Sequence, residues 1–196
     1  MQAEFSVEIG PDAAALEIPW RSEDGSLRYL DLRAQPELLL NIKEGRLYRP
    51  LGEFLSSINS SGSMLQTAKC DTWTTRKLGP DEEAFGSPCK FASYVDLVFA
   101  DDAPRYSFEQ HERLGQAACR LLGKAPEISA AAEFVLRRCF FHDDSDPDAS
   151  RDGYCLTLYA SGYGDDEEEA QRRWTIALKL LENALLQLSA SGFQKT

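Results

Sequence analysis

The sequence lacks most of the short motifs from which an activity can be recognised. None of its five cysteines is spaced as CxxC, and it has no glycine-rich loop with a phosphate-binding lysine, no G-x-S-x-G and no H-E-x-x-H. These absences argue against a P-loop site, a serine-hydrolase elbow and a zinc-protease site. We therefore predict no catalytic residue and no cofactor, and lean away from an enzyme.

Long apolar runs and basic charge are also scarce. No stretch approaches the roughly 20 apolar residues of a membrane helix, and the N-terminus has no basic head followed by an apolar stretch. The 21 basic and 32 acidic residues give a net charge of -11, which repels nucleic acid and anionic lipid. We expect a cytoplasmic protein with reduced thiols that binds neither nucleic acid nor membranes.

What is present is the composition of a folded domain. Of the 196 residues, 43% are apolar and 27% are charged, which is ordinary for globular proteins. This length is enough for one hydrophobic core, and two small domains would be a stretch. We expect a single α+β domain over residues 1–196.

The N-terminal portion, residues 1–60, is expected to hold strands and then short helices. Strict alternation of apolar and polar residues over 4–9 predicts a strand. Residues 15–20 and 27–32 look like two strands of a hairpin, joined by a turn-forming cluster that contains glycine.

Prolines mark the two short helices of this portion. Proline suits the first turn of a helix, so one helix is predicted from Pro36 to about Gly45 and another from Pro50 to about Ile58. The serine-rich stretch 59–63 is then the nearest thing to a linker.

Residues 65–190 show a strand, strand, helix pattern twice, which reads as an internal repeat. Each helix begins with a capping signal: Ser107 with Gln110 in the first, and an acidic cluster around Asp166 in the second. The pattern predicts a largely antiparallel sheet with helices packed on one face. The expected strands are 67–75, 91–100, 133–142 and 154–162, and the first helix ends near Gly123.

The last helix is more apolar than a sheet-covering helix needs to be. Its apolar residues span an arc of roughly 200°, against the ~100° stripe that one sheet face would bury. A second surface must cover the excess. That surface is a neighbouring helix, the N-terminal segment or another copy of the chain.

Alternation along the strands also predicts a second sheet face that mixes aromatic and charged side chains. Aromatic residues are enriched at contact surfaces, so this face is a candidate binding site. The residues assigned to it are Lys69, Asp71, Trp73, Tyr94, Asp96, Arg138 and Tyr159.

Two acids and a histidine in this region have a catalytic and a structural interpretation. Asp71 and Asp96 could pair for acid–base chemistry, or each could join Lys69 or Arg138 in a cross-strand ion pair. His111 lies on the apolar face of its predicted helix, where a buried, hydrogen-bonded histidine is the favoured interpretation. The structural interpretation is preferred for all three.

An aspartate-rich stretch between the last two strands has the ligand spacing of a calcium loop. Ala149 stands where such a loop has glycine and Cys155 where it has glutamate, so a solvated acidic hairpin is favoured over a weak calcium site. The candidate ligands are Asp144, Asp146, Asp148 and Asp152.

Three functions remain open from the sequence. The first is a non-enzymatic protein that acts through protein–protein contacts, as a homodimer; the second is a small-molecule-binding domain that uses the polar sheet face; the third is a carboxylate-based hydrolase or isomerase. From about Leu51 onward the order of elements is similar to that of small acidic α+β secretion-chaperone-like domains, and this resemblance implies a dimer.

Overall fold

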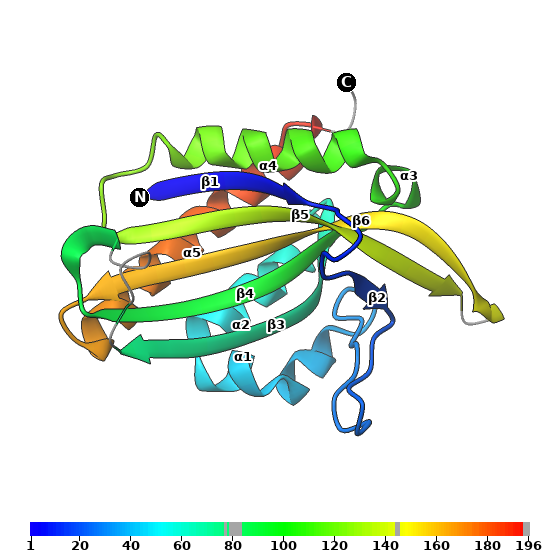
Figure 1. The fold of residues 1–196 in the computed structure, drawn as a ribbon, viewed down its shortest axis with the longest axis horizontal. Coiled ribbons are helices and arrows are strands. Elements are labelled where there is room, and N and C mark those ends of the chain that lie inside the picture. The colour runs from blue at the N-terminus through cyan, green and yellow to red at the C-terminus, as the bar shows by residue number, and fades with distance from the viewer. Residues whose placement is uncertain (77, 79–83, 144–145, 194–196) are drawn as a thin grey trace.

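The computed structural model describes residues 1–76, 78, 84–143 and 146–193, with helices and strands in the order shown in Figure 1. The N-terminal portion holds two strands and three short helices, with proline in the first turn of the first and the last helix. Its elements are β1 (Gln2–Glu8), β2 (Leu16–Ile18), the 3-10 helix η1 (Pro36–Asn41), α1 (Lys43–Leu47) and α2 (Arg49–Ile58).

The remaining elements contain the predicted order of strand, strand, helix twice. Ser107 Oγ accepts a hydrogen bond from Gln110 N at 3.2 Å, and Asp166 Oδ1 accepts one from Glu169 N at 2.8 Å, so both helix starts are capped as expected. The elements are β3 (Leu65–Arg76), η3 (Ala84–Gly86), β4 (Cys89–Phe99), α3 (Asp102–Arg105), α4 (Phe108–Leu122), β5 (Ala130–Asp143), β6 (Asp146–Gly164) and α5 (Glu167–Ala190).

One mixed sheet organises these elements. Five strands follow the order β1-β5-β6-β4-β3, and β2 pairs with β5 beyond the end of β1. The pairs among β3, β4, β5 and β6 are antiparallel, which confirms the largely antiparallel sheet, whereas β1 and β2 run parallel to β5. Alternation in a sequence marks a strand without naming its partner, so the parallel pairs were not predicted.

The predicted hairpin of residues 15–20 and 27–32 is wrong in its second half. The chain does turn at Ser22, whose N–H donates to Leu27 O at 2.9 Å, and an isolated bridge joins Arg21 to Arg28. Residues 27–32 nevertheless form no strand, since β2 has already taken β5 as its partner. This segment instead crosses the end of the sheet as an anchored loop.

Helix α5 lies behind the strands in Figure 1 and contacts β4, β5 and β6, and both α2 and α4 contact α5. Trp174 of α5 is fully buried there, where its Nε1 donates to Ser93 Oγ at 2.9 Å. Glycine permits this close approach: a Cβ on Gly162 of β6 would clash with the α5 backbone at Ala170 and Trp174. The side chains of this main core come from both helices and strands.

The surplus apolar arc of α5 is covered within the chain. α5 contacts the sheet, α2 and α4, and of its large apolar side chains only Ile176 is markedly exposed, at 44%. Glu182, on the side toward α2, is 7% exposed and accepts hydrogen bonds from Ser57 and Lys179. Two neighbouring helices are therefore the second surface that the sequence required.

We call the side of the sheet opposite α5 the open face. A smaller core covers one end of it. There Ile18 of β2 packs on Val98, Cys139, Phe141 and Cys155. The N-terminal segment thus covers only that end, seen at the right of Figure 1. Among the described residues, no helix is long and apolar enough to cross a membrane.

Candidate functional site

The open face carries six of the seven residues predicted for binding. In the strand register Lys69 lies opposite Asp96, while Tyr94 lies opposite both Asp71 and Tyr159. Residues directly opposite in an antiparallel pair point to the same side of the sheet. Alternation therefore brings together Lys69, Asp71, Trp73, Tyr94, Asp96 and Tyr159.

Arg138 is the residue that the structure places elsewhere. It lies opposite Tyr154, which packs against the main core, and its Nη2 donates to Asp152 Oδ2 at 3.0 Å. Arg137 occupies the open face instead, with its Nη2 2.9 Å from Glu8 Oε2. An error of one residue along a strand moves a side chain to the opposite face.

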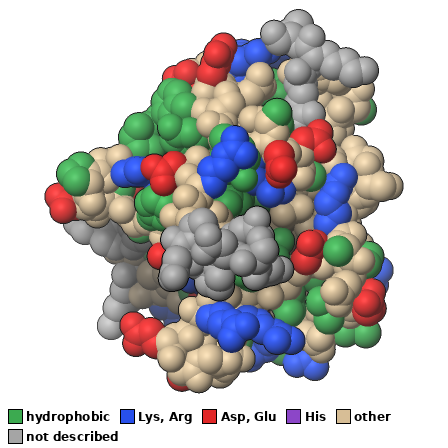
Figure 2. Space-filling view, turned by 90° about the vertical axis from the view of Figure 1, so that its right-hand side faces the viewer, with side chains coloured by type: hydrophobic (Ala, Val, Ile, Leu, Met, Phe, Trp, Pro, Cys, Tyr) green, Lys and Arg blue, Asp and Glu red, His purple; other side chains and the backbone are tan. Residues whose placement is uncertain are grey.

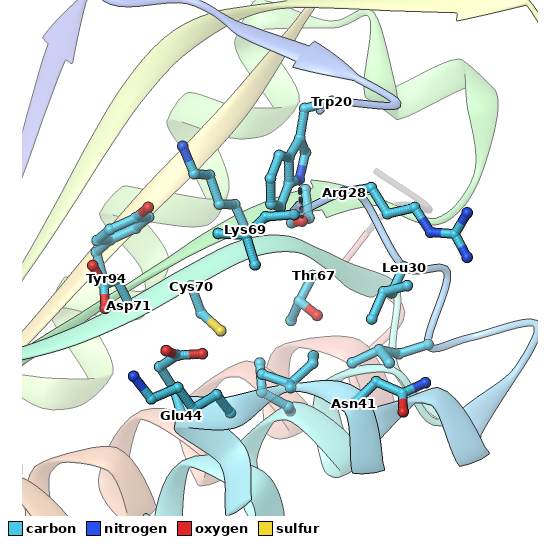
Figure 3. A pocket seen from close by; sticks show the side chains of 16 residues that line it. Trp20, Arg28, Leu30, Asn41, Glu44, Thr67, Lys69, Cys70, Asp71 and Tyr94 are labelled. Carbon is cyan, nitrogen blue, oxygen red and sulfur yellow. Dashed lines mark hydrogen bonds between the residues drawn. The ribbon is translucent and has the colours of Figure 1, made fainter. Parts of the chain in front are cut away.

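A cavity of about 370 Å³ lies at the outer edge of β3, and we call it the edge cavity. Most of its lining comes from three segments, residues 20–32 after β2, residues 41–44 at the junction of η1 and α1, and residues 67–71 of β3; Leu55 of α2 and Tyr94 of β4 complete it. Figure 3 shows Trp20 and Arg28 on one side of the strand and Asn41 and Glu44 on the other. The volume falls in the range of small-molecule pockets.

A β-bulge shapes the strand that forms this cavity. The pairing of β3 with β4 shifts between Thr67 and Lys69, so Ala68 is an extra residue. Its carbonyl oxygen accepts a hydrogen bond from Trp20 Nε1 at 2.7 Å, and Lys69 Nζ lies 5.2 Å from the centre of the same indole ring. The bulge thereby ties the loop to the strand and places a cation over Trp20.

The other walls are fixed by side-chain hydrogen bonds to the backbone. Arg33 Nη1 donates to Ser60 O and Ser63 O, both at 2.9 Å, which ties the loop to the turn after α2. Asn59 accepts from Thr67 N at 3.0 Å and donates to Thr67 Oγ1 at 2.7 Å. The cavity is therefore preorganised, which lowers the cost of binding.

These contacts also occupy hydrogen-bonding groups along β3, which pairs with no strand other than β4 among the described residues. Thr67 N and Ala68 O bond to Asn59 and Trp20, and Thr72 N donates to the carboxylate of Asp71 at 2.7 Å. An exposed edge would otherwise be a template for another strand. Capped backbone groups favour a compact ligand over an added strand here.

The rim of the edge cavity carries more positive than negative side chains. Arg28, Lys43 and Lys69 line it and make no ion pair with a described residue, against two acids, Glu44 and Asp71. Elsewhere the signs are mixed, as on the face in Figure 2, where acidic and basic side chains lie among each other. An excess of cations is unusual in a chain of net charge -11.

Cys70 is the thiol of the edge cavity, and Figure 3 shows its sulfur turned toward Glu44. Burial, together with the charges of Glu44, Asp71 and Asp96, raises the pKa of Cys70 to about 12. The group is a neutral thiol at pH 7, which makes it a poor nucleophile. Cys70 contributes an apolar surface rather than chemistry.

A second hollow, of about 160 Å³, adjoins the edge cavity. Lys69 and Tyr94 line both hollows. We call the second hollow the Asp96 chamber. Asp96 is 6% exposed there and accepts a hydrogen bond from Thr157 Oγ1 at 2.6 Å. Burial raises the pKa of this carboxyl, although the Thr157 hydrogen bond and the charges of Lys69 and Arg137 oppose the shift.

Three aromatic rings adjoin the chamber on the open face. The ring centres of Trp73, Tyr94 and Tyr159 lie 6.2–6.4 Å apart in pairs. Burial, and next the charges of Asp96 and Asp71, raises the pKa of Tyr94, so its hydroxyl stays protonated. The face thus offers flat apolar surfaces beside a few polar groups.

The two candidate catalytic aspartates stand in different surroundings. Asp71 is exposed and binds Thr72 N, whereas Asp96 is buried and binds Thr157. Asp71 and Asp96 are diagonal neighbours in the register, so we expect their Cα atoms to lie roughly 7–8 Å apart. No hydrogen bond of the described residues joins them, and the paired-carboxylate interpretation gains no geometric support.

His111 sits in the main core, away from both hollows. It is 1% exposed, its Nδ1 lies 2.8 Å from Ser107 O, and its ring packs on Phe99 and Tyr154. Burial lowers the pKa of His111 to about 4. A neutral, packed imidazole agrees with the structural interpretation.

Of the four predicted calcium ligands, Asp144 lies outside the described residues. Asp146, Asp148 and Asp152 belong to strand β6. A strand rises about 3.3 Å per residue, so the backbone at 146 and 152 is separated by roughly 20 Å instead of curling around an ion. Asp152 forms an ion pair with Arg138, and the described residues contain no metal-binding cluster.

Sequence reasoning did not assign Trp20, Arg28 and Lys43 to a site. They come from the loop and helix segments that close over the edge of β3. No periodicity connects them, because their meeting depends on the β2–β5 pairing and on the bulge at Ala68. A tryptophan beside the turn at 22–25 was the only local signal.

Comparison of the chain with protein-family models, with curated proteins and with solved structures gives no match. The residues and their geometry are therefore the basis for a functional assignment.

Proposed function

We propose that this protein is a small-molecule-binding domain whose ligand is an organic anion with an apolar body, held in the edge cavity. The observation that carries the proposal is the cavity of about 370 Å³ whose rim carries cations that make no ion pair with a described residue. Apolar side chains of Leu30, Leu32, Ile42 and Leu55 would contact the ligand body. Such a division between apolar walls and few polar groups is common to ligand pockets.

The charges at the rim select the acidic end of the ligand. Lys43 and Arg28 are exposed and Lys69 lies over Trp20, so a carboxylate would gain charge-assisted hydrogen bonds without displacing an ion pair to any described residue. A neutral alcohol of the same length would gain only the apolar contacts. The proposal therefore concerns acids such as medium-chain fatty acids or aryl carboxylates.

A thermal-shift panel tests the proposal. Octanoate and phenylpropionate are expected to raise Tm, and octanol and phenylpropanol to raise it much less; stabilisation grows with ligand concentration, by about 2.7 kcal/mol at a hundred times Kd. Lys43→Glu should abolish the response. Arg46→Glu changes the same charge on the same helix away from the edge cavity, and it should keep the response.

Equal shifts for the acids and the alcohols would refute the role of the cations. A panel without any response from the wild-type protein would refute the function itself.

Self-association is a second candidate, because Leu40 and Leu47 are exposed by 72% and 63% on η1 and α1. Two exposed leucines on neighbouring short helices resemble the start of a protein contact. Light scattering over a range of concentrations tests this proposal. A dimer that Leu40→Asp converts to monomer would support it, and a wild-type monomer at every concentration would refute it.

A further inference from the structure

The Asp96 chamber has a chemistry different from that of the edge cavity. Its polar lining comes from the open face of four adjacent strands, β5, β6, β4 and β3, and two exposed alanines of the N-terminal segment, Ala14 and Ala15, also line it. Lys69 and Tyr94 stand between the two hollows. The residues that line the chamber are Ala14, Ala15, Leu16, Lys69, Tyr94, Asp96, Arg137, Cys155, Thr157 and Tyr159.

Asp96 is a buried acid with one hydrogen-bond partner. Among the described residues only Thr157 donates a hydrogen bond to it, from Oγ1 to Oδ1. No described residue donates to Oδ2. A carboxylate has about four acceptor positions, and a buried one with a single donor is poorly compensated for its lost hydration. The chamber therefore has an open acceptor suited to a cationic donor.

Arg137 supplies the complementary feature. Its Nη2 pairs with Glu8, but its Nε is buried and has no hydrogen-bond partner among the described residues. Lys69 Nζ likewise makes no ion pair with a described residue. Buried donors are normally satisfied, so an Nε without a described partner, in a chamber that Lys69 also lines, indicates room for an acceptor that bears negative charge.

A ligand with one charge satisfies only half of this arrangement. A simple carboxylate would meet Arg137 and Lys69 but would face Asp96, and a simple amine would meet Asp96 but would face both cations. A zwitterion pairs with all three groups. The rings of Tyr94 and Tyr159, 6.2 Å apart, add aromatic faces against which an ammonium is favoured.

We infer that the Asp96 chamber is a binding site for a free α-amino acid with a small side chain. The ammonium group bonds to Asp96 Oδ2, and the carboxylate accepts from Arg137 Nε and Lys69 Nζ. The chamber's volume of about 160 Å³ leaves room for a side chain such as that of alanine or serine and excludes large ones. The inference does not require a ligand in the edge cavity, although the two hollows share Lys69 and Tyr94 in their linings.

Calorimetric titration of the full chain with L-alanine tests the inference through matched analogues. N-acetyl-L-alanine lacks the ammonium group, and ethylamine lacks the carboxylate. We expect saturable binding of alanine and at least about tenfold weaker binding of each analogue, since each loses charge-assisted hydrogen bonds. Equal binding of alanine and either analogue, or no binding of alanine, would overturn the inference.

Two variants locate the site. Asp96→Asn keeps the shape and an acceptor for Thr157 but removes the charge, and it should weaken alanine binding by about tenfold or more. Asp71→Asn removes an exposed charge on the same face that does not line the chamber, and binding should remain. Loss of binding in both variants alike would overturn the assignment to the chamber.

A third variant does not disturb the sheet. Ala15→Phe enlarges an exposed residue at the mouth of the chamber, removes no hydrogen bond and should block alanine. The response to octanoate in the edge cavity should persist in this variant, so the two sites can fail separately. Unchanged alanine binding in Ala15→Phe would contradict the assignment even if Asp96→Asn did not fold.

Discussion

The two sides of strand β4 show how one strand serves both folding and binding. On the side of α5 it carries buried apolar residues of the main core, such as Leu97 and Phe91, and Phe91 packs on the ring of Trp174. On the open face Tyr94 and Asp96 border two hollows. Because the buried apolar side chains lie mainly on the helix side, changes on the open face should alter binding more than folding.

The largest predicted effect comes from replacing a tryptophan with alanine, once on each side of the sheet. Trp174→Ala removes a fully buried ring and should lower the free energy of unfolding by about 3–5 kcal/mol. Trp73→Ala, on the open face and 36% exposed, should cost about 1 kcal/mol or less. Denaturant unfolding measures the free energy of unfolding of both variants. Similar losses in the two would show that the helix side does not dominate stability.

The next effect concerns His111 in the helix-side core. Its folded pKa of about 4 lies below the unfolded value near 6.5, so the unfolded chain takes up a proton first as pH falls. Stability is lost as pH drops from about 6.5 toward 4, by about 3 kcal/mol from this group.

The check is the pH dependence of the unfolding free energy in the wild type and in His111→Leu. The variant should lack this component of the slope between the two pH values. Parallel slopes would show that His111 titrates normally in the folded protein.

A smaller effect is expected where the loop meets the edge of β3. Trp20→Phe keeps an aromatic ring but removes the hydrogen bond to Ala68 O, which is worth about 1 kcal/mol. The loop should then open more often. Hydrogen exchange over residues 20–32 measures this, with faster exchange expected in the variant, and unchanged exchange would show that the bond does not hold the wall.

The smallest effect is expected at Arg138, which sequence reasoning placed in the site. Its ion pair with Asp152 is solvent-exposed, with 43% and 67% of the two side chains accessible. Arg138→Gln should change stability by about 0.5 kcal/mol or less and leave ligand binding unchanged. A clear loss of binding, measured by the same thermal-shift panel, would place Arg138 in a site after all.

Sequence patterns predicted the local elements of the fold well and their long-range partners poorly. Alternation assigned Tyr94 and Asp96 to one sheet face, on which the strand register also places them, and the Ser107 cap is as expected. These features depend on neighbouring residues. The parallel pairing of β1 and β2 depends on contacts between distant segments, which a period cannot encode.

The residues of the candidate site also fall into a group that could be predicted from local patterns and a group that could not. Its sheet residues could be predicted because a strand has two faces, apart from the one-residue displacement at Arg138. Its loop residues could not be predicted, because Trp20 reaches β3 only through the bulge at Ala68. The cavity is a product of the tertiary structure and has no sequence motif.

The fluorescence of Trp20 tests the binding account most directly, since this residue lines the edge cavity. In Trp73→Phe protein the other remaining tryptophan, Trp174, is fully buried and serves as a constant background. Titration with octanoate should change the emission saturably, and Lys43→Glu should remove the change while octanol causes little. Emission unchanged by every acid, or changed equally by acid and alcohol, would contradict the account.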